Sequence, residues 1–122
     1  MKTSNKVILA LFLIALVFLA YYLVISSRAP GQYDSFAKCL TEKGFEMYGA
    51  YWCQHCKDQK LLFRKSFNYI NYTECTQKID ECDKAGINKY PTWIFPDSTM
   101  YEGVLPLEKL SSLSSCELKK DE

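Results

Sequence analysis

The sequence has little of the residues that build metal sites or charged binding surfaces. Its 122 residues include a single histidine, and 15 basic residues are interspersed with 14 acidic ones. One histidine and one Cys-x-x-Cys motif fall short of the four ligands of a structural zinc site, and no basic stripe is present for a nucleic acid partner. Repeats and low-complexity stretches are also absent, so the length predicts one small domain plus whatever precedes it.

Charge is missing from one long N-terminal stretch. Residues 7–25 are 19 residues without a charge, a proline or a glycine, and at about 1.5 Å per residue they would cross most of a ~30 Å hydrocarbon core. The stretch exceeds the roughly 7 to 15 apolar residues of a secretory signal, and Pro30 directly follows the best small-x-small triplet. We therefore expect an uncleaved membrane anchor rather than a signal peptide.

Basic residues on either side of this stretch set the predicted orientation. Lys2 and Lys6 precede it, whereas only Arg28 closely follows it, which favours a cytoplasmic N-terminus. The chain is then a single-pass protein of the cell membrane with its domain on the extracytoplasmic side. The predicted segments are a cytoplasmic N-terminus at 1–6, a transmembrane anchor at 7–25, a linker at 26–32, the domain at 33–116 and a charged, disordered tail at 117–122.

Hydrophobic periodicity and turn signals predict an α/β domain. Helices are expected over 33–43, 57–67 and 76–85, strands over 45–51 and 69–74, a hairpin from 92–95 and 99–102, and a last helix opening at Pro106. Asp34 or Ser35 should cap the first helix. The side chains expected on the buried helix faces are Leu61, Leu62, Phe63, Phe67, Ile79, Cys82, Leu107, Leu110 and Leu113.

A Cys-x-x-Cys motif lies where the first strand meets the second helix. If Cys53 occupies the helix start, free backbone N–H groups and the helix dipole favour its thiolate, which is the reactive form. Cys56, one turn later, can close a small disulfide and suits the resolving thiol. His55 can hydrogen-bond or charge-stabilise the Cys53 thiolate and make the disulfide more oxidising. Two alternatives stay open: a solvent-exposed His55 without a role, and cysteines that are half of a metal site.

Tyr90-Pro91-Thr92 is a second candidate region. Pro91 precedes a strand about 35 residues after the Cys-x-x-Cys motif, and this spacing favours a cis proline that presents a flat surface to the reactive sulfur. By itself, Tyr-Pro is only a turn signal. Trp52, Tyr90 and Thr92 are the expected substrate-binding residues, and Trp93 could add to an apolar rim around them.

Together these motifs resemble the thioredoxin superfamily. The resemblance rests on residues 51–56, on residues 90–92 and on a following hairpin with Gly103, and it spans roughly residues 36–116. More narrowly, residues 36–40, 47–56 and 90–94 and the closing Cys116 resemble the thioredoxin-like domain fused to bacterial vitamin K epoxide reductase homologues.

This resemblance implies a thioredoxin-like fold, a central mixed sheet flanked by helices, here preceded by one transmembrane helix. It also implies a domain that exchanges disulfides with secreted proteins and is reoxidised by a quinone-linked membrane enzyme. No cofactor or metal is expected in the domain itself. Since the sequence has one span and no quinone-site bundle, that enzyme would be a separate protein.

Two positions depart from the resemblance. Gln54 stands where relatives often have proline, which leaves the redox potential open. Met47 stands where thioredoxins usually have a buried acid that relays the resolving cysteine's proton, and the adjacent Glu46 should point to the other face of the strand. Water or His55 is therefore expected to carry this proton.

The other four cysteines can pair in three ways. We favour Cys75 with Cys82, which are close in sequence, and Cys39 with Cys116, which would tie the first helix to the last. Structural bridges are the preferred interpretation. The alternative is that Cys75 and Cys82 relay electrons.

The sequence therefore predicts a membrane-anchored enzyme that exchanges disulfides with extracytoplasmic protein thiols, in the oxidising direction. A reductase or an isomerase would use the same atoms. A membrane-tethered metal-binding module and a redox-inert docking domain are the alternatives from other classes.

Overall fold

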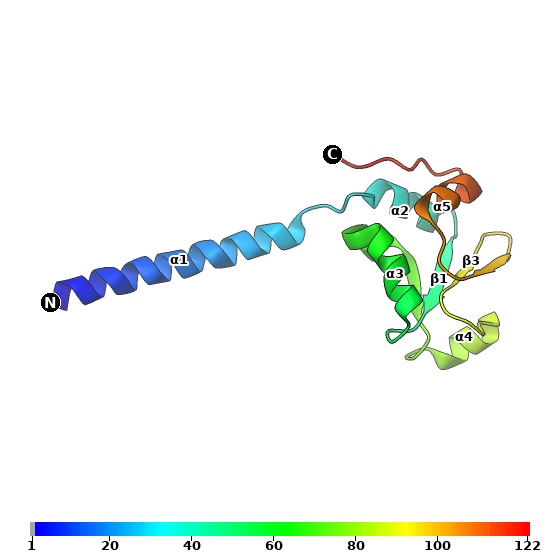
Figure 1. Cartoon of the computed structure of the whole chain (residues 1–122), viewed down its shortest axis with the longest axis horizontal. Helices are drawn as coiled ribbons and strands as arrows, with labels where there is room; N and C mark the ends of the chain where they lie inside the picture. The colour runs from blue at the N-terminus through cyan, green and yellow to red at the C-terminus, as the bar shows by residue number, and fades with distance from the viewer. Residues whose placement is uncertain (1) are drawn as a thin grey trace.

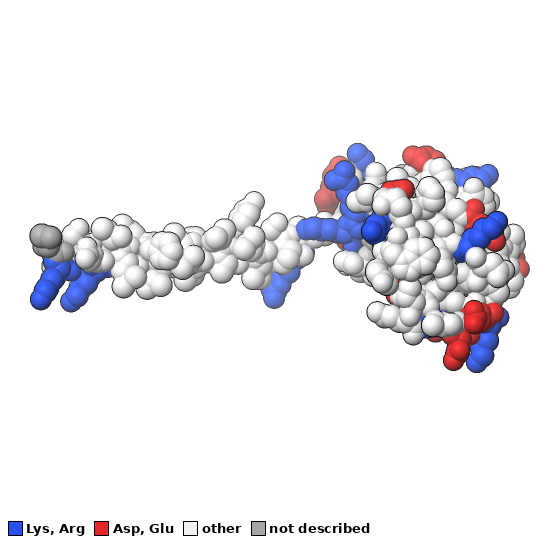
Figure 2. Space-filling model, turned by 60° about the horizontal axis from the view of Figure 1, so that its bottom comes forward, with Lys and Arg blue, Asp and Glu red and all other residues white. Residues whose placement is uncertain are grey.

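The computed structural model describes residues 2–122; Met1, part of the predicted cytoplasmic N-terminus, lies outside the described residues. Helix α1, Lys2–Arg28, extends away from the rest of the chain (Figure 1). Its 27 residues reach a mean hydropathy of 3.0 in the most apolar window, and none of that window is buried. Figure 2 shows basic side chains at its two ends and an uncharged surface between them. This helix is long and apolar enough to span a membrane.

A four-stranded mixed sheet forms the centre of the domain in the described part of the chain, in the order β2-β1-β3-β4. Strand β1, Glu46–Gly49, pairs in parallel with β2, Asn71–Glu74, and antiparallel with β3, Thr92–Ile94. Strand β4, Met100–Glu102, completes the sheet as the antiparallel partner of β3. The Cys-x-x-Cys motif follows directly after the inner strand β1.

Helices cover both faces of this sheet. They are α2 at Asp34–Glu42, α3 at Gln54–Phe63 with a 3₁₀ extension η1 at Arg64–Tyr69, α4 at Ile79–Ala85 and α5 at Leu107–Ser114. Successive strand residues point to opposite faces. Met47 accordingly lies in a larger core with α2, α3 and α5, and Tyr48 lies in a smaller core with Cys82 of α4. A central mixed sheet flanked in this way is a thioredoxin-like fold, as the sequence predicted.

Gln59 fixes α3 against the sheet and against the segment before α5. Its side chain is fully buried, and its Oε1 accepts hydrogen bonds from Trp93 Nε1 at 3.1 Å and Leu105 N at 2.7 Å. Its Nε2 donates to the Leu105 carbonyl at 3.0 Å. Each of these groups would cost about 1–3 kcal/mol if it were buried without a partner. The orientation of α3, and with it of the cysteine pair, is therefore held from within the core.

Several apolar side chains predicted to be buried are exposed instead. The exposed fractions are 67% for Leu61, 39% for Leu62, 62% for Ile79 and 43% for Leu113. In α3 the buried positions are Cys56, Gln59 and Phe63, so one polar residue belongs to the buried stripe. At 3.6 residues per turn, Leu61 points away from that stripe. The prediction was wrong here because it followed residue type rather than the helical period.

The start of α2 also differs from the prediction. Its N-cap position is Tyr33, which makes no side-chain capping bond. Asp34 does not cap the helix, because its carboxylate accepts from Gly31 N at 3.0 Å and from Ser66 Oγ at 2.7 Å. The acid predicted as a cap therefore fastens the linker to η1.

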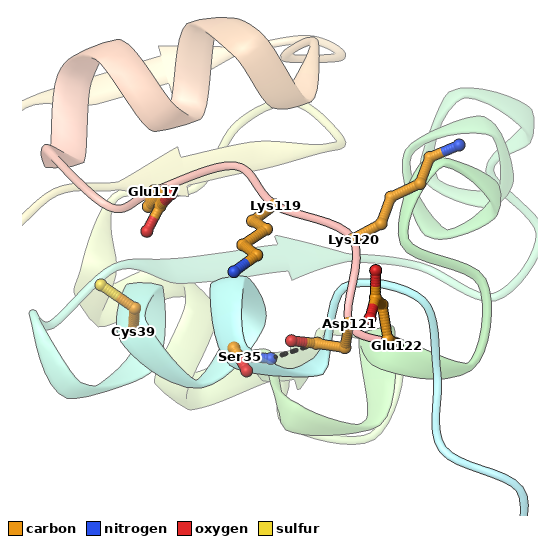
Figure 3. A pocket seen from close by; sticks show the side chains of 7 residues that line it. All are labelled: Ser35, Cys39, Glu117, Lys119, Lys120, Asp121 and Glu122. Atoms are coloured by element: carbon orange, nitrogen blue, oxygen red, sulfur yellow. Dashed lines mark hydrogen bonds between the residues drawn. The ribbon is translucent and has the colours of Figure 1, made fainter.

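The C-terminal tail supplies the missing cap. Ser35 N donates to Asp121 Oδ2 at 2.8 Å, and Asp121 N donates to the Gln32 carbonyl at 2.8 Å (Figure 3). A carboxylate at a helix N-terminus is stabilised by the free N–H groups there. The expectation that residues 117–122 are disordered is therefore wrong, since the tail runs back to the start of α2.

Candidate redox site

Cys53 occupies the start of α3. Its backbone is extended, it is the N-cap residue of the helix, and its N–H donates to the Ala50 carbonyl at 3.1 Å. The Cys53 sulfur accepts a hydrogen bond from Cys56 N at 3.2 Å. A thiolate on Cys53 would therefore meet a helix N–H group and the positive end of the helix dipole. This is the placement that the sequence predicted for the attacking sulfur.

Cys56 lies deeper in the domain. Its side chain is 1% exposed, compared with 8% for Cys53. Burial raises the pKa of the Cys56 thiol to about 12; its hydrogen bond to Cys53 adds to the rise, and the Ala50 backbone opposes it. Cys56 is therefore a protonated thiol at neutral pH, and its sulfur is shielded from large partners.

The other four cysteines form two closed bridges. Cys39 is bonded to Cys116 with an S–S distance of 2.03 Å, and Cys75 to Cys82 with 2.02 Å. These are the two pairs favoured from the sequence. Cys53 and Cys56 are the free cysteines in the described part of the chain. The chain therefore has one open dithiol and two bridges elsewhere.

Aromatic side chains surround the Cys53 end of α3. Trp52 is 60% exposed, and its ring meets the Tyr90 ring edge-on at a centroid distance of 5.9 Å. Tyr51, which sequence reasoning did not assign to this rim, is 68% exposed. Trp93 does not belong to the rim, because it is fully buried and bonded to Gln59.

The segment that carries the predicted proline lies beside this rim. The Tyr90–Pro91 peptide bond is cis, and the Pro91 carbonyl accepts from Gly103 N at 2.8 Å. Thr92 is buried, and its hydroxyl donates to the Lys89 carbonyl at 2.7 Å. A substrate contact at Thr92 would therefore come from its backbone, and the substrate-binding role of this segment stays a prediction.

His55 points to solvent. Its side chain is 76% exposed, and its Nδ1 lies 3.6 Å from Asp58 Oδ2 on the same helix. The structure gives it no hydrogen bond to Cys53 among residues 2–122. Its predicted effect on the Cys53 thiolate stays a prediction, and any such effect would act through solvent.

Sequence reasoning missed the residues beneath Cys56. Tyr72 OH donates to Glu74 Oε2 at 2.7 Å, and Glu74 also accepts from Tyr51 N at 3.1 Å and Thr76 Oγ1 at 2.7 Å. Burial alone would raise the pKa of Glu74, but hydrogen bonds from Tyr72 and Thr76 outweigh it and lower the pKa. Burial and the Glu74 carboxylate raise the pKa of Tyr72 far above its usual range. Strand alternation, which puts Tyr72 and Glu74 on one face of β2, was the signal that could have found them.

The side chains that could hold a metal are scattered. Within residues 2–122, no three His, Cys, Asp or Glu side chains come together as ligands. Among the residues that the structure describes, the second half of a zinc site, which the metal-binding alternative needs, is not assembled around Cys53 and Cys56.

A cysteine pair at a helix start, on a thioredoxin-like sheet with a cis proline before β3, defines the class as a thioredoxin-like domain with a dithiol site. No family model matches the chain. The chain is similar to the protein named thiol-disulfide oxidoreductase LTO1 from Arabidopsis thaliana, with 35% identity over 103 residues that cover 77% of this chain and 27% of the plant protein. The chain thus spans about a quarter of the length of that relative.

Proposed function

We propose that this chain is a membrane-anchored thiol–disulfide oxidoreductase that oxidises extracytoplasmic protein thiols through Cys53 and Cys56. The observation that supports this most is the unequal pair: Cys53 caps α3 with its sulfur toward a helix N–H, and Cys56 is buried one turn later. Such a pair separates an attacking sulfur from a resolving one. The similarity to a plant protein named for this activity points the same way.

The exchange needs only these two sulfurs. In the oxidising direction, a substrate thiolate attacks Cys53 Sγ of the closed pair, the Cys53–Cys56 bond breaks, and Cys56 leaves with the electron pair and takes up a proton. A second substrate thiolate then attacks the substrate sulfur of the mixed disulfide and releases Cys53 as a thiolate. The substrate loses two electrons and the Cys53–Cys56 pair gains them.

The exposed aromatic rim suits a protein substrate. Tyr51 and Trp52, the two residues before Cys53, are exposed, and Tyr90 packs against Trp52. Aromatic side chains at a surface can bind an extended, unfolded chain without specificity for its sequence. The substrates would be secreted proteins that still carry thiols or wrong disulfides.

The oxidising direction follows from the proposed location. Helix α1 would anchor the chain, and the basic residues at its start would keep the N-terminus in the cytoplasm. Two closed bridges in a small domain suit an oxidising compartment. A quinone-linked membrane enzyme of the vitamin K epoxide reductase type would then reoxidise Cys53 and Cys56. A reductase or an isomerase would use the same site with electrons flowing the other way.

The test uses the full chain in detergent. The oxidised chain should reoxidise reduced, unfolded ribonuclease at stoichiometric amounts, and the Cys53→Ser variant should not. The equilibrium potential of the pair against glutathione decides the direction: about −120 mV indicates an oxidase, and about −270 mV a reductase. In intact cells first treated with a membrane-impermeant reductant, a membrane-impermeant thiol reagent should label Cys53, and labelling only after lysis would contradict the proposed orientation.

A further inference from the structure

Opening and closing the pair requires a proton to leave or reach Cys56. Cys56 is only 1% exposed, so water does not reach its sulfur freely. Strand β1 offers no acid toward it, because Met47 is apolar and fully buried and Glu46 is hydrogen-bonded to Tyr48 OH and Asn71 Nδ2. The chain therefore needs another path for this proton.

Gly49 leaves a small space that the Cys56 sulfur and the Tyr72 hydroxyl both border. A Cβ atom built on Gly49 would lie 2.9 Å from Cys56 Sγ and 3.2 Å from Tyr72 OH. Both groups therefore border the same small space, which any side chain at position 49 would fill. The Tyr72 hydroxyl donates its hydrogen to Glu74, so a lone pair of its oxygen is free to accept from the Cys56 thiol.

Glu74 connects this hydroxyl with solvent. Its side chain is half-buried, with one carboxylate oxygen bonded to Tyr72 and the other to Tyr51 N and Thr76 Oγ1. Lys60 Nζ lies 3.9 Å from the centre of the Tyr72 ring and brings a positive charge over the same group. Cys56, Tyr72 and Glu74 thus form an ordered series from the core to the surface.

We infer that Tyr72 and Glu74 carry the proton between Cys56 and solvent, in place of a buried acid on β1. When the Cys56 thiol attacks the Cys53 sulfur of a mixed disulfide, its proton passes to the Tyr72 oxygen while the Tyr72 proton passes to Glu74. The bond between Cys53 and the partner breaks, the partner leaves as a thiolate, and Glu74 releases the proton to water. The reverse sequence protonates Cys56 when the pair opens.

The two transfers must be concerted, because neither a free Cys56 thiolate nor a free Tyr72 phenolate is stable at neutral pH. Burial holds the pKa of both groups well above neutrality. Tyr72 borders the same small space as the reacting Cys56 sulfur. Glu74 acts only through Tyr72 and is therefore a positioning residue. This inference rests on the proposed function, since it assigns a role within the same exchange.

The domain contains a matched control pair. Tyr48 OH donates to Glu46 Oε2 at 2.8 Å, with the same two-residue spacing as in Tyr72 and Glu74. Tyr48 lies in the smaller core beside Cys75 and Cys82, which form a closed bridge without a proton to transfer. Removing this hydroxyl changes a similar strand hydrogen bond but leaves the proposed path intact.

The experiment follows the reduced full chain in detergent with 5,5′-dithiobis(2-nitrobenzoate) in a stopped-flow instrument. Cys53 attacks the reagent and releases one thionitrobenzoate; Cys56 then attacks Cys53 and releases a second. The first phase reports the attacking sulfur, and the second reports deprotonation of Cys56. In Tyr72→Phe and Glu74→Gln the second phase should slow about 100-fold, with the first phase unchanged. Glu74→Asp should recover part of the rate.

Tyr48→Phe and Glu46→Gln should leave both phases at the parental rates. The inference is overturned if Tyr72→Phe keeps the parental second phase, or if it slows both phases equally, as a merely structural change would. A parental chain without any second phase would instead contradict the proposed function. The two failures are therefore distinguishable in one set of traces.

Discussion

The open pair Cys53 and Cys56 and the two closed bridges are built from the same residue but differ in placement. Burial does not separate them, because Cys75, Cys82 and Cys116 are at most 3% exposed, comparable with Cys56. The open pair begins a helix directly after a central strand, with a helix N–H on the first sulfur. If the open pair is redox-active, as proposed, the helix N–H groups and proton access distinguish it from the two bridges, because burial does not.

Replacing Cys53 should have the largest effect. Cys53→Ser removes the attacking sulfur, so disulfide exchange with reduced ribonuclease should fall to background. The double variant Cys75→Ser/Cys82→Ser should keep the parental exchange rate, because a structural bridge transfers no electrons. Loss of exchange in the double variant, with its fold intact by circular dichroism, would support the alternative that these two cysteines relay electrons.

The two bridges should differ from each other in their contribution to stability. They span sequence separations of 77 and 7 residues. In the chain-entropy model, removing Cys39–Cys116 should lower the free energy of unfolding by about 4.5 kcal/mol, and removing Cys75–Cys82 by about 2.5 kcal/mol. Urea unfolding of Cys39→Ala/Cys116→Ala and Cys75→Ala/Cys82→Ala measures both values. If removing the short bridge Cys75–Cys82 lowered the free energy of unfolding more than removing Cys39–Cys116, loop length would not explain how the bridges stabilise the domain.

A methyl group at position 49 should crowd both Cys56 and Tyr72. In Gly49→Ala the new Cβ would stand 2.9 Å from Cys56 Sγ, which is closer than van der Waals contact. Such overpacking costs about 1–3 kcal/mol of unfolding free energy. The double variant Gly49→Ala/Cys56→Ala should regain part of this loss, because the clashing sulfur is gone while the contact with Tyr72 remains. If the losses of unfolding free energy from Gly49→Ala and Cys56→Ala simply add in the double variant, the clash with the sulfur is not the cause of the Gly49→Ala loss.

His55 should have the smallest effect. Its ring is 76% exposed and lies 3.6 Å from Asp58, so water screens any charge that it places near Cys53. His55→Ala should make the pair less oxidising by under about 30 mV, which corresponds to about 1.4 kcal/mol. Equilibration with glutathione measures this shift, and a shift several times larger would mean that His55 contacts the Cys53 thiolate directly.

The fold and the position of the open cysteine pair could be predicted because their signals are local. The Cys-x-x-Cys motif between a strand and a helix identifies both, and Gly44 and Gly86 end their helices with positive φ values of 85° and 76°, as expected for such stops. The order of helices and strands was predicted correctly, with shifts of a few residues at their ends.

The failed or missing predictions concern contacts between distant segments. Asp121 caps a helix 86 residues earlier in the chain, and no local pattern indicates this. Glutamine is usually a surface residue, so the sequence does not indicate that Gln59 is buried. It is buried because Trp93 and Leu105 supply hydrogen-bond partners for its amide. Tyr72 and Cys56 border the same space only because β2 pairs with β1 and Gly49 has no side chain to fill it.

Trapping the mixed disulfide tests the central claim most directly. Incubated with a reduced peptide and an oxidant, Cys56→Ser cannot resolve the intermediate and should accumulate the peptide on Cys53, as located by mass spectrometry of the non-reduced digest. Cys53→Ser should accumulate almost none, because Cys56 is buried. Equal trapping in the two variants, or peptide attached at Cys39, Cys75, Cys82 or Cys116, would contradict the assignment of Cys53 as the attacking sulfur.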